Sequence, residues 1–492
     1  MEYKDFYEAK SPLQANTDCF AIQNISSLLI DLKVGQTFPE FKKCCENFNS
    51  SVIEKDISSV GISLNKIYEC LKLDLKFLQK YIIELNLIEN IMTSFTLLLE
   101  EMKTCEENDH FRKSTLKFIQ INLYNILLLL LNASDSIIKH VVVDCNLYQN
   151  LFDSVSLVLF FDQGILFLSI FHNFFPYYKE YELSTDFPDE NFDKIISLNN
   201  NDNVFAGDLL TCYLIDFFYD ICDYFNISLE VASYIMTGIY IAVFNFPNIE
   251  YLVKSIAVFR LLFQKHKCMI IDFIELGYAH LFINLLDYKK NLDSPEIDIQ
   301  YCKLFIFLYE AAEDDETKIR VLQEIKPELL KYPLKKNDVK QYDISSVIHL
   351  IQVLILHDFL SLSDFLLFYY DLILDLLQDS SFPTKKSILK LFYEIALSSS
   401  WKDLPYTTVT EFIENCLDVT TPDDSEMTLM FLNGLLEAFK ILDEGFTFMI
   451  INFYSSHEEI SSFFEEVLLC GTEEMKAIVR DIQIIIDEFN PE

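Results

Sequence analysis

The sequence predicts an all-α protein made of many consecutive helices. Glycine and proline, with 9 and 12 residues, together make up about 4% of the 492-residue chain, against about 12% in an average protein. Folds that need many tight turns or hairpins are therefore disfavoured. Leu, Ile, Phe and Val also recur at helical spacing between polar connectors. From about residue 290 onward the connectors are roughly 20 to 45 residues apart, which is typical of stacked helix pairs or triplets.

The expected helices follow one another along the chain. Apolar residues have helical spacing over 210–225, 253–264, 300–312, 347–359, 387–398 and 428–442. The connectors that separate such runs are 180–208, 288–297, 325–345, 379–386, 399–407 and 419–426. We expect a poorly ordered lead over 1–19, an N-terminal helical-repeat lobe over 20–180, a polar insert over 181–207 and an acidic C-terminal helical-repeat lobe over 208–490.

One helix start has a clear capping signal. Ser361 stands three residues before Asp364, as in a capping box, at the start of an apolar run. A single helix from this point would place Asp364, Asp371 and Asp375 within about 40° of one another at about 100° per residue. We therefore expect one solvated acidic stripe on an otherwise buried helix.

A short pattern occurs three times in the chain. The matching segments are 82–92, 142–152 and 273–283. Asn86 and Asn146 fall at the same place in the first two segments, and Gly277 takes that place in the third. Gly and Asn are the residues that most easily adopt a positive φ at the end of a helix. The pattern therefore predicts three corners with a left-handed residue, each joining two helices.

Residues 248–287 resemble a single armadillo repeat. The resemblance is carried by Ala257 and Leu261 in a middle helix, by an Ile-Ile-Asp-Phe-Ile-Glu-Leu-Gly turn and by an apolar third helix. Similar patterns cover about 80–152, 248–312 and 370–490. The resemblance to the armadillo/HEAT-like class implies a right-handed α-solenoid of helical hairpins and triplets, whose extended surface binds other proteins.

Armadillo import receptors grip basic peptides with repeated Trp and Asn residues, but this chain has a single tryptophan, Trp401, in a connector. The departure argues against a role as an import adaptor. We expect Trp401 to pack between hairpins, because an indole buries a large area.

The charge is strongly acidic and unevenly distributed. Lys and Arg number 38 and Asp and Glu number 76, which gives a net charge of −38. Residues 391–492 contain 4 basic and 21 acidic side chains, so this end alone has a net charge of −17. Such a surface repels nucleic acids and favours a basic protein or peptide as partner. The acidity could also serve only to keep an apolar protein in solution.

The search for chemistry finds no catalytic, cofactor or metal site in the sequence. It contains no GxGxxG, no GxxxxGK[ST], no GxSxG, no CxxC and no HExxH. His349 and His357 lie eight residues apart in a helical run, but one helix seldom supplies enough metal ligands, so a pair at the core edge is the preferred interpretation. We interpret His266, with Lys267 and Cys268, as a polar corner between helices.

Two acidic clusters and one basic cluster have simple explanations. Asp314, Asp315 and Glu316, and likewise Asp423, Asp424 and Glu426, are expected to be solvated charges at helix starts. Replacement of Asp423, Asp424 and Glu426 by Lys should then slow the association of a basic partner without lowering the melting temperature of the protein. The only basic cluster comprises Lys331, Lys335, Lys336 and Lys340, in a connector expected to be solvated.

The compartment is predicted to be the cytoplasm or nucleus. Twelve cysteines are scattered in apolar helical pattern and lack the spacing of a disulfide framework, and the N-terminus has no hydrophobic signal segment. The uncharged run 231–249 contains Pro247, so its helix of about 24 Å is short for a bilayer core of about 30 Å. We therefore expect no membrane insertion.

The sequence thus predicts a non-enzymatic protein-interaction scaffold or adaptor with a basic partner and no cofactor. One alternative is an obligate structural or regulatory subunit of a larger complex, and a second is a polytopic membrane protein. The sequence leaves the oligomeric state open.

Overall fold

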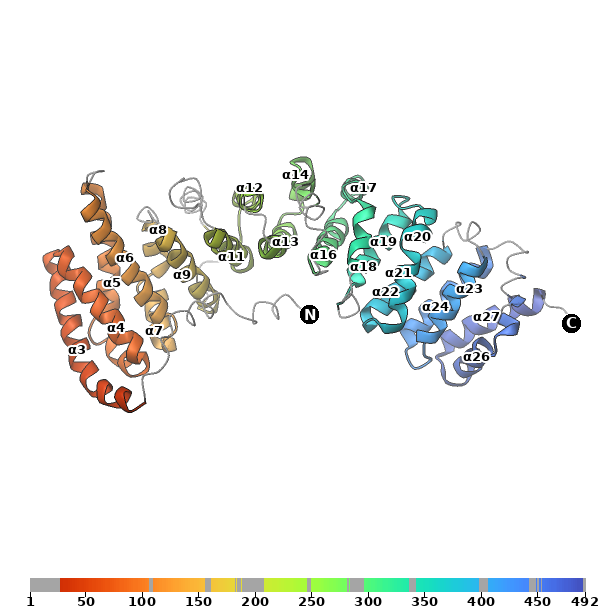
Figure 1. Ribbon diagram of the computed structural model, residues 1–492, viewed down its shortest axis with the longest axis horizontal. Helices are drawn as coiled ribbons and strands as arrows, with labels where there is room; N and C mark the ends of the chain where they lie inside the picture. The colour runs from red at the N-terminus through yellow and green to blue at the C-terminus, as the bar shows by residue number, and fades with distance from the viewer. Residues whose placement is uncertain are drawn as a thin grey trace. The chain divides into compact units, whose positions relative to one another are not determined.

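The computed structural model of the chain is shown in Figure 1. The structure describes residues 27–105, 109–154, 161–181, 208–245, 249–280, 296–335, 342–397, 406–441 and 454–489, together with Leu183, Phe187, Ile283, Phe448, Ile451 and Asn452. Over these residues the protein is helical and contains no strand. The all-α prediction is confirmed.

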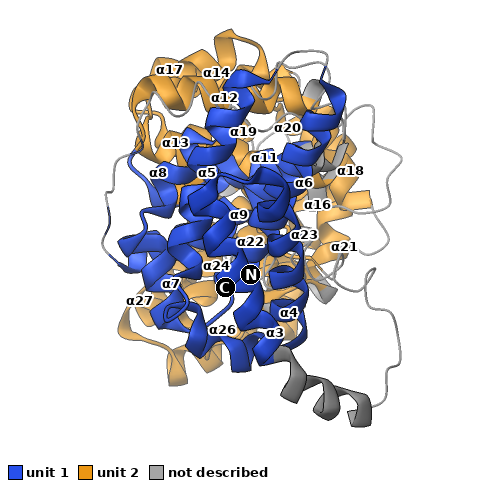
Figure 2. Cartoon of the chain, turned by 90° about the vertical axis from the view of Figure 1, so that its left-hand side faces the viewer, with its two compact units in different colours: residues 1–220, 224–226 blue, residues 221–223, 227–492 orange. Residues whose placement is uncertain are grey.

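The chain divides into two compact units, coloured separately in Figure 2. Unit 1 comprises residues 1–220 and 224–226, and unit 2 comprises 221–223 and 227–492. The polar insert expected over 181–207 lies mostly outside the described residues, as do the lead over 1–19, Trp401, Lys336 and Lys340. Within the insert, Phe187 is buried, and its backbone N–H donates to the carbonyl oxygen of Asn226 at 3.1 Å.

The helices of unit 1 follow one another with short connections. They are α3 (Ser27–Glu54), α4 (Ile57–Ile82), α5 (Leu87–Thr104), α6 (His110–Leu130), α7 (Asp135–Lys139), the π-helical turn η1 (His140–Asp144), α8 (Leu147–Asp153), α9 (Phe161–Glu180) and α11 (Asp208–Tyr224), whose last turn reaches into unit 2. α3 packs on α4, α4 on α6 and α6 on α9. Aromatic rings fill the core next to α9, where Phe171 contacts Phe152, Phe175 and Phe217.

Unit 2 contains a longer run of helices. They are α12 (Leu229–Asn245), α13 (Ile249–Lys265), α14 (Met269–Glu275), α16 (Glu296–Ala311), α17 (Asp315–Gln323), the 3₁₀ turn η3 (Pro327–Leu330), α18 (Lys331–Lys335), α19 (Ser345–Leu356), α20 (Leu362–Phe368), α21 (Tyr370–Asp379), α22 (Phe382–Leu397), α23 (Tyr406–Val419), α24 (Ser425–Ile441), α26 (Glu458–Cys470) and α27 (Glu473–Phe489).

Six helices of unit 2 pack in succession. α13 contacts α16, α16 contacts α19, α19 contacts α22, α22 contacts α24, and α24 contacts α27. Figure 1 shows α16, α19, α22 and α24 following one another in this order. The six helices begin at 249, 296, 345, 382, 425 and 473, so their starts are 37 to 49 residues apart. Each of the first five helices therefore packs on the helix that starts 37 to 49 residues later.

The three predicted corners are confirmed. Asn86 has φ of 50°, Asn146 has φ of 49° and Gly277 has φ of 78°, all in the left-handed region. The same hydrogen bond is also formed in each of the first two corners. The Asn90 side-chain amide donates to the carbonyl oxygen of Asn86 at 2.7 Å, and the Asn150 amide donates to that of Asn146 at 3.2 Å. One local conformation thus explains the matching Asn and Gly positions.

The predicted helix starts are also confirmed. Ser361 Oγ accepts from the backbone N–H of Asp364 at 3.1 Å, and Asp314 Oδ1 accepts from that of Thr317 at 2.8 Å. The single helix expected after Ser361 is wrong, because α20 ends at Phe368 and α21 begins at Tyr370. Asp364, Asp371 and Asp375 are exposed as expected, although they lie on two helices.

Two of the three acidic residues at the start of α24 form contacts within the protein and are not simply solvated. Asp424 Oδ1 accepts from the backbone N–H of Met427 at 3.1 Å, and Glu426 forms an ion pair with Lys386. Reversing Asp423, Asp424 and Glu426 together would remove both contacts. Because the loss of a helix cap is destabilising, this change should lower the melting temperature, contrary to the expectation from the sequence.

Within the described residues, no single helix is both long and apolar enough to cross a bilayer. α4 and α5, which meet at a bend of 103°, meet the length and composition criteria only when they are taken together.

Candidate functional site

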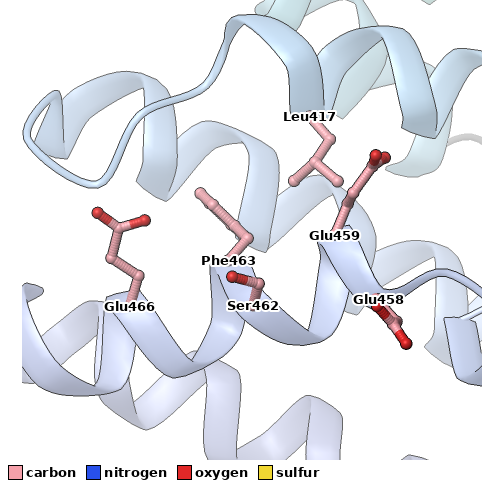
Figure 3. Close-up of a pocket in the computed structure, with 6 residues that line it drawn as sticks. All are labelled: Leu417, Glu458, Glu459, Ser462, Phe463 and Glu466. Atoms are coloured by element: carbon pink, nitrogen blue, oxygen red, sulfur yellow. The ribbon is translucent and has the colours of Figure 1, made fainter.

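A groove lies between α23 and α26 in unit 2, and Figure 3 shows the six residues that line it. Its volume is about 390 Å³. Leu417 comes from α23, and the other lining residues come from α26: Glu458, Glu459, Ser462, Phe463 and Glu466. The groove therefore combines an apolar pair with three carboxylates.

The spacing along α26 explains why these side chains share one face. Glu459, Phe463 and Glu466 are separated by four and three residues, which places them on adjacent turns of one helix surface. Phe463 is 7% exposed and fixes this face, because its ring packs on Phe431 with centroids 5.8 Å apart. Glu458 and Glu459 occupy the first turn of α26, where the helix dipole favours negative charge.

The lining of the groove is negatively charged, because Glu458, Glu459 and Glu466 all contribute to it. α23 carries three acidic residues, α26 carries four, and neither helix contains Lys or Arg. His457, just before α26, has Nε2 3.1 Å from Glu414 Oε1 and so connects the two helices. An open acidic surface with an apolar base is suited to bind a cationic segment with an apolar side chain. Ser462 is the only hydroxyl-bearing residue among those that line the groove.

The two histidines that attracted attention in the sequence have separate partners. His357 follows the last residue of α19, and its Nε2 lies 2.7 Å from the hydroxyl of Tyr309 in α16. His349 is half-buried, and burial, followed by the nearby Lys390, lowers its pKa. Neither belongs to a group of metal-ligating side chains found among the described residues.

The polar corner at 266–268 agrees with its interpretation. His266 lies between α13 and α14, and its Nε2 is 2.9 Å from the carbonyl oxygen of Ile227. In the basic cluster, Lys331 has its Nζ 5.5 Å from the centre of the Phe368 ring, which is a contact within the protein.

The sequence analysis missed one cluster in unit 1. Glu89, His140 and Cys145 offer ligand atoms within 4.8 Å of one another, and within the described part of the chain they are the one such trio. Glu89 is 51 residues from His140 in the sequence, so the cluster cannot be recognised from a short sequence motif. The matching corner segments contain Glu89 and Cys145, but the alignment itself gives no reason to bring them together.

Neither the models of known protein families nor the curated protein sequences include a match to this chain.

Proposed function

We propose that this protein is a non-enzymatic scaffold or adaptor of the armadillo-like class, acting in the cytoplasm or nucleus, and that it binds a basic protein segment in the α23–α26 groove. The observation that carries the proposal is the groove itself. Three glutamates, Glu458, Glu459 and Glu466, line it beside the apolar pair Leu417 and Phe463, and no basic residue is among its lining residues. Binding platforms of helical repeats use extended surfaces of this kind.

The architecture that we propose is a right-handed solenoid of armadillo/HEAT-like units. Two observations support it. Within unit 2, successive helices starting 37 to 49 residues apart pack on one another, which is close to the period of about 40 to 47 residues in HEAT and armadillo repeats. The recurring left-handed corner at Asn86, Asn146 and Gly277 gives the units a common connection.

Recognition in the groove would combine two contributions. Lys or Arg side chains of the partner would pair with Glu459 and Glu466, whose separation of seven residues is about 10 Å along α26. A Leu or Phe between them would cover Leu417 and Phe463. The charged pairs are exposed and contribute little affinity individually, so they set the association rate and the choice of partner, whereas the apolar contact slows dissociation.

The test measures binding of a fluorescent peptide of Lys and Leu to the full chain by anisotropy, with a peptide of Glu and Leu as the matched control. We expect the basic peptide alone to bind, with an association rate that falls as salt rises, because exposed charges are screened over about 8 Å at physiological salt. Equal binding of both peptides, or a salt-independent association rate, would remove the basis of the proposal.

Two neighbouring glutamates supply a matched pair of variants. Glu466 lines the groove, whereas Glu465 is exposed on the same helix and does not line it. Glu466→Lys and Glu465→Lys change the net charge equally. We expect the first to weaken peptide binding several-fold more than the second. If the two variants lose affinity equally, the acidity acts only through the overall field and the groove is not the binding site.

The alternative function, an obligate subunit of a larger complex, is favoured by a different observation. Several large apolar side chains are strongly exposed, including Phe111 at 85%, Leu367 at 73% and Leu469 at 79%. Size-exclusion chromatography of the isolated chain separates the two functions, because a free scaffold elutes as one defined species. Aggregation that co-expression with a co-purifying protein relieves would favour the subunit. Insertion of the chain as a polytopic membrane protein is a weaker alternative, which membrane fractionation tests.

A further inference from the structure

Glu89, His140, Asp144 and Cys145 form a compact polar cluster in unit 1. His140 is at its centre, with Nε2 2.9 Å from Glu89 Oε1 and 3.8 Å from Cys145 Sγ. The other ring nitrogen, Nδ1, lies 2.8 Å from Asp144 Oδ2. One ring edge of the histidine thus faces an oxygen and a sulfur ligand, and the opposite edge is held by a carboxylate.

The π-helical turn brings His140 and Cys145 together. In a regular α-helix, residues five apart are separated by about 140° around the axis, because each residue turns the chain by about 100°. Here the backbone N–H of Cys145 donates to the carbonyl oxygen of His140 at 3.0 Å, which is the wider i to i+5 bond of a π turn. Single π turns of this kind are often found at functional sites.

Glu89 reaches the histidine from the preceding corner. It lies in the first turn of α5, three residues after Asn86, and its side chain is 44% exposed. One of its oxygens, Oε2, is nevertheless buried and has no hydrogen-bond partner. A buried carboxylate oxygen without a donor is unfavourable, so this atom has the capacity to accept a further ligand.

Ionisation of Cys145 would place a thiolate beside the carboxylates of Glu89 and Asp144. Burial, followed by the fields of Glu89 and Asp144, raises the pKa of Cys145 to about 11. Burial acts to lower the pKa of His140, but hydrogen bonds to Asp144 and Glu89 prevail and raise it. Negative charge from Glu89 and Asp144 thus adds to the effect of burial at Cys145 and opposes it at His140. A bound divalent cation would reverse this balance and deprotonate a coordinating thiol.

We propose that Glu89, His140 and Cys145 bind a divalent transition-metal ion of the zinc type, with Asp144 as the positioning residue for the histidine. The ion takes the place of the contact between His140 Nε2 and Glu89 Oε1. Nδ1–H continues to donate to Asp144, which gives the carboxylate, histidine and metal order common in zinc sites.

The donor set selects the class of metal. One imidazole, one thiolate and one carboxylate are typical of Zn²⁺, whereas Ca²⁺ and Mg²⁺ require mostly oxygen ligands. With bonds of about 2.0 Å to nitrogen and about 2.3 Å to sulfur, a tetrahedral ion holds these atoms about 3.5 Å apart. The Nε2 to Sγ distance of 3.8 Å is close to this value. Three protein ligands leave one position for water or an exchangeable ligand.

The test is a titration of the reduced full-length protein with Co²⁺, which reports thiolate coordination through a sulfur-to-cobalt absorption band in the near ultraviolet. We expect one equivalent to produce the band and Zn²⁺ to displace it. Cys145→Leu should abolish the band while the chain stays folded, because Leu85 and Leu276 occupy the same position in the other two corners. Absence of the band in the wild type, or its persistence in Cys145→Leu, would overturn the proposal.

Two further variants complete the test. Cys268 is exposed next to His266 and imitates a cysteine and histidine pair outside the cluster, so Cys268→Ser should leave the band unchanged. Asp144→Asn should retain the band but weaken Co²⁺ binding about 10- to 100-fold, as loss of an orienting carboxylate does in other metal sites. A band that disappears with Cys268→Ser would assign it to adventitious binding, and unchanged affinity in Asp144→Asn would remove Asp144 from the site.

Discussion

Replacement of Gly277 tests the corner conformation directly. Its φ is 78°, and a Cβ built on it would have no atom within 4 Å beyond those of Gly277 and the two adjacent residues. A side chain at this position therefore meets no steric obstacle from its surroundings, and the cost comes from the backbone alone. For an L-residue with a branched side chain, the left-handed region costs about 1–2 kcal/mol or somewhat more. Gly277→Val should be destabilising by this amount, whereas Gly277→Asn should be tolerated as at Asn86 and Asn146.

Thermal unfolding followed by circular dichroism measures the difference. Unit 2 contains about 270 residues, and with an unfolding entropy of about 2.1 cal/mol/K per residue, 1–2 kcal/mol lowers the melting temperature by about 2–4 °C. Gly434 provides the control, because a Cβ there would lie 3.0 Å from the Phe392 ring and 3.3 Å from the Tyr393 backbone. At this position Asn and Val should both be destabilising. Equal melting temperatures for Gly277→Val and Gly277→Asn would refute the conformational explanation.

Two further predictions concern unit 1 and the edge of the unit 2 core. Asn86 has a positive φ and its side chain makes no cap bond, so Asn86→Gly should be neutral, whereas Asn86→Ala should cost about 1 kcal/mol by urea denaturation; equal stability of the two variants would contradict this. Burial lowers the pKa of His349 below its usual value of 6.5, with Lys390 adding to the effect and Glu310 opposing it. The unfolded chain therefore binds a proton at a higher pH than the folded chain does. Stability from this group is complete above about pH 6.5 and is lost as the pH falls through the folded-state pKa. Urea denaturation between pH 7 and 5 should show a shallower loss for His349→Gln than for the wild type, and parallel curves would exclude the effect.

The features that could be predicted from the sequence depend on neighbouring residues. Whether Asn86, Asn146 and Gly277 adopt a left-handed φ is decided mainly by their own side chains, so three matched positions were enough to predict it. Helix caps such as that of Asp314 are equally local, since the acceptor and the donor are three residues apart. The break at Tyr369 was missed, because the apolar pattern continues through it and contains no Gly or Pro there.

The groove could be predicted only in its charge. The excess of acidic residues after 391 is visible in the composition, and the groove lies in this part of the chain. The trio first selected, Asp423, Asp424 and Glu426, turned out to include a helix cap and an ion pair. The carboxylates of the groove lie instead on α26, and only the packing of α26 beside α23 distinguishes Glu466 from Glu465.

The cluster around His140 depends on two structural features that no sequence motif predicts. A π turn places His140 and Cys145 on one side, although an α-helical reading of the same residues separates them. The contact with Glu89 then joins two successive corners of the repeating pattern. Leu85 and Leu276 have the position of Cys145 in the other corners. A corner that serves only as a connection therefore functions with leucine at this position, so cysteine there is not required by the fold. Cys145→Leu is for this reason the variant that separates the proposed metal binding from folding.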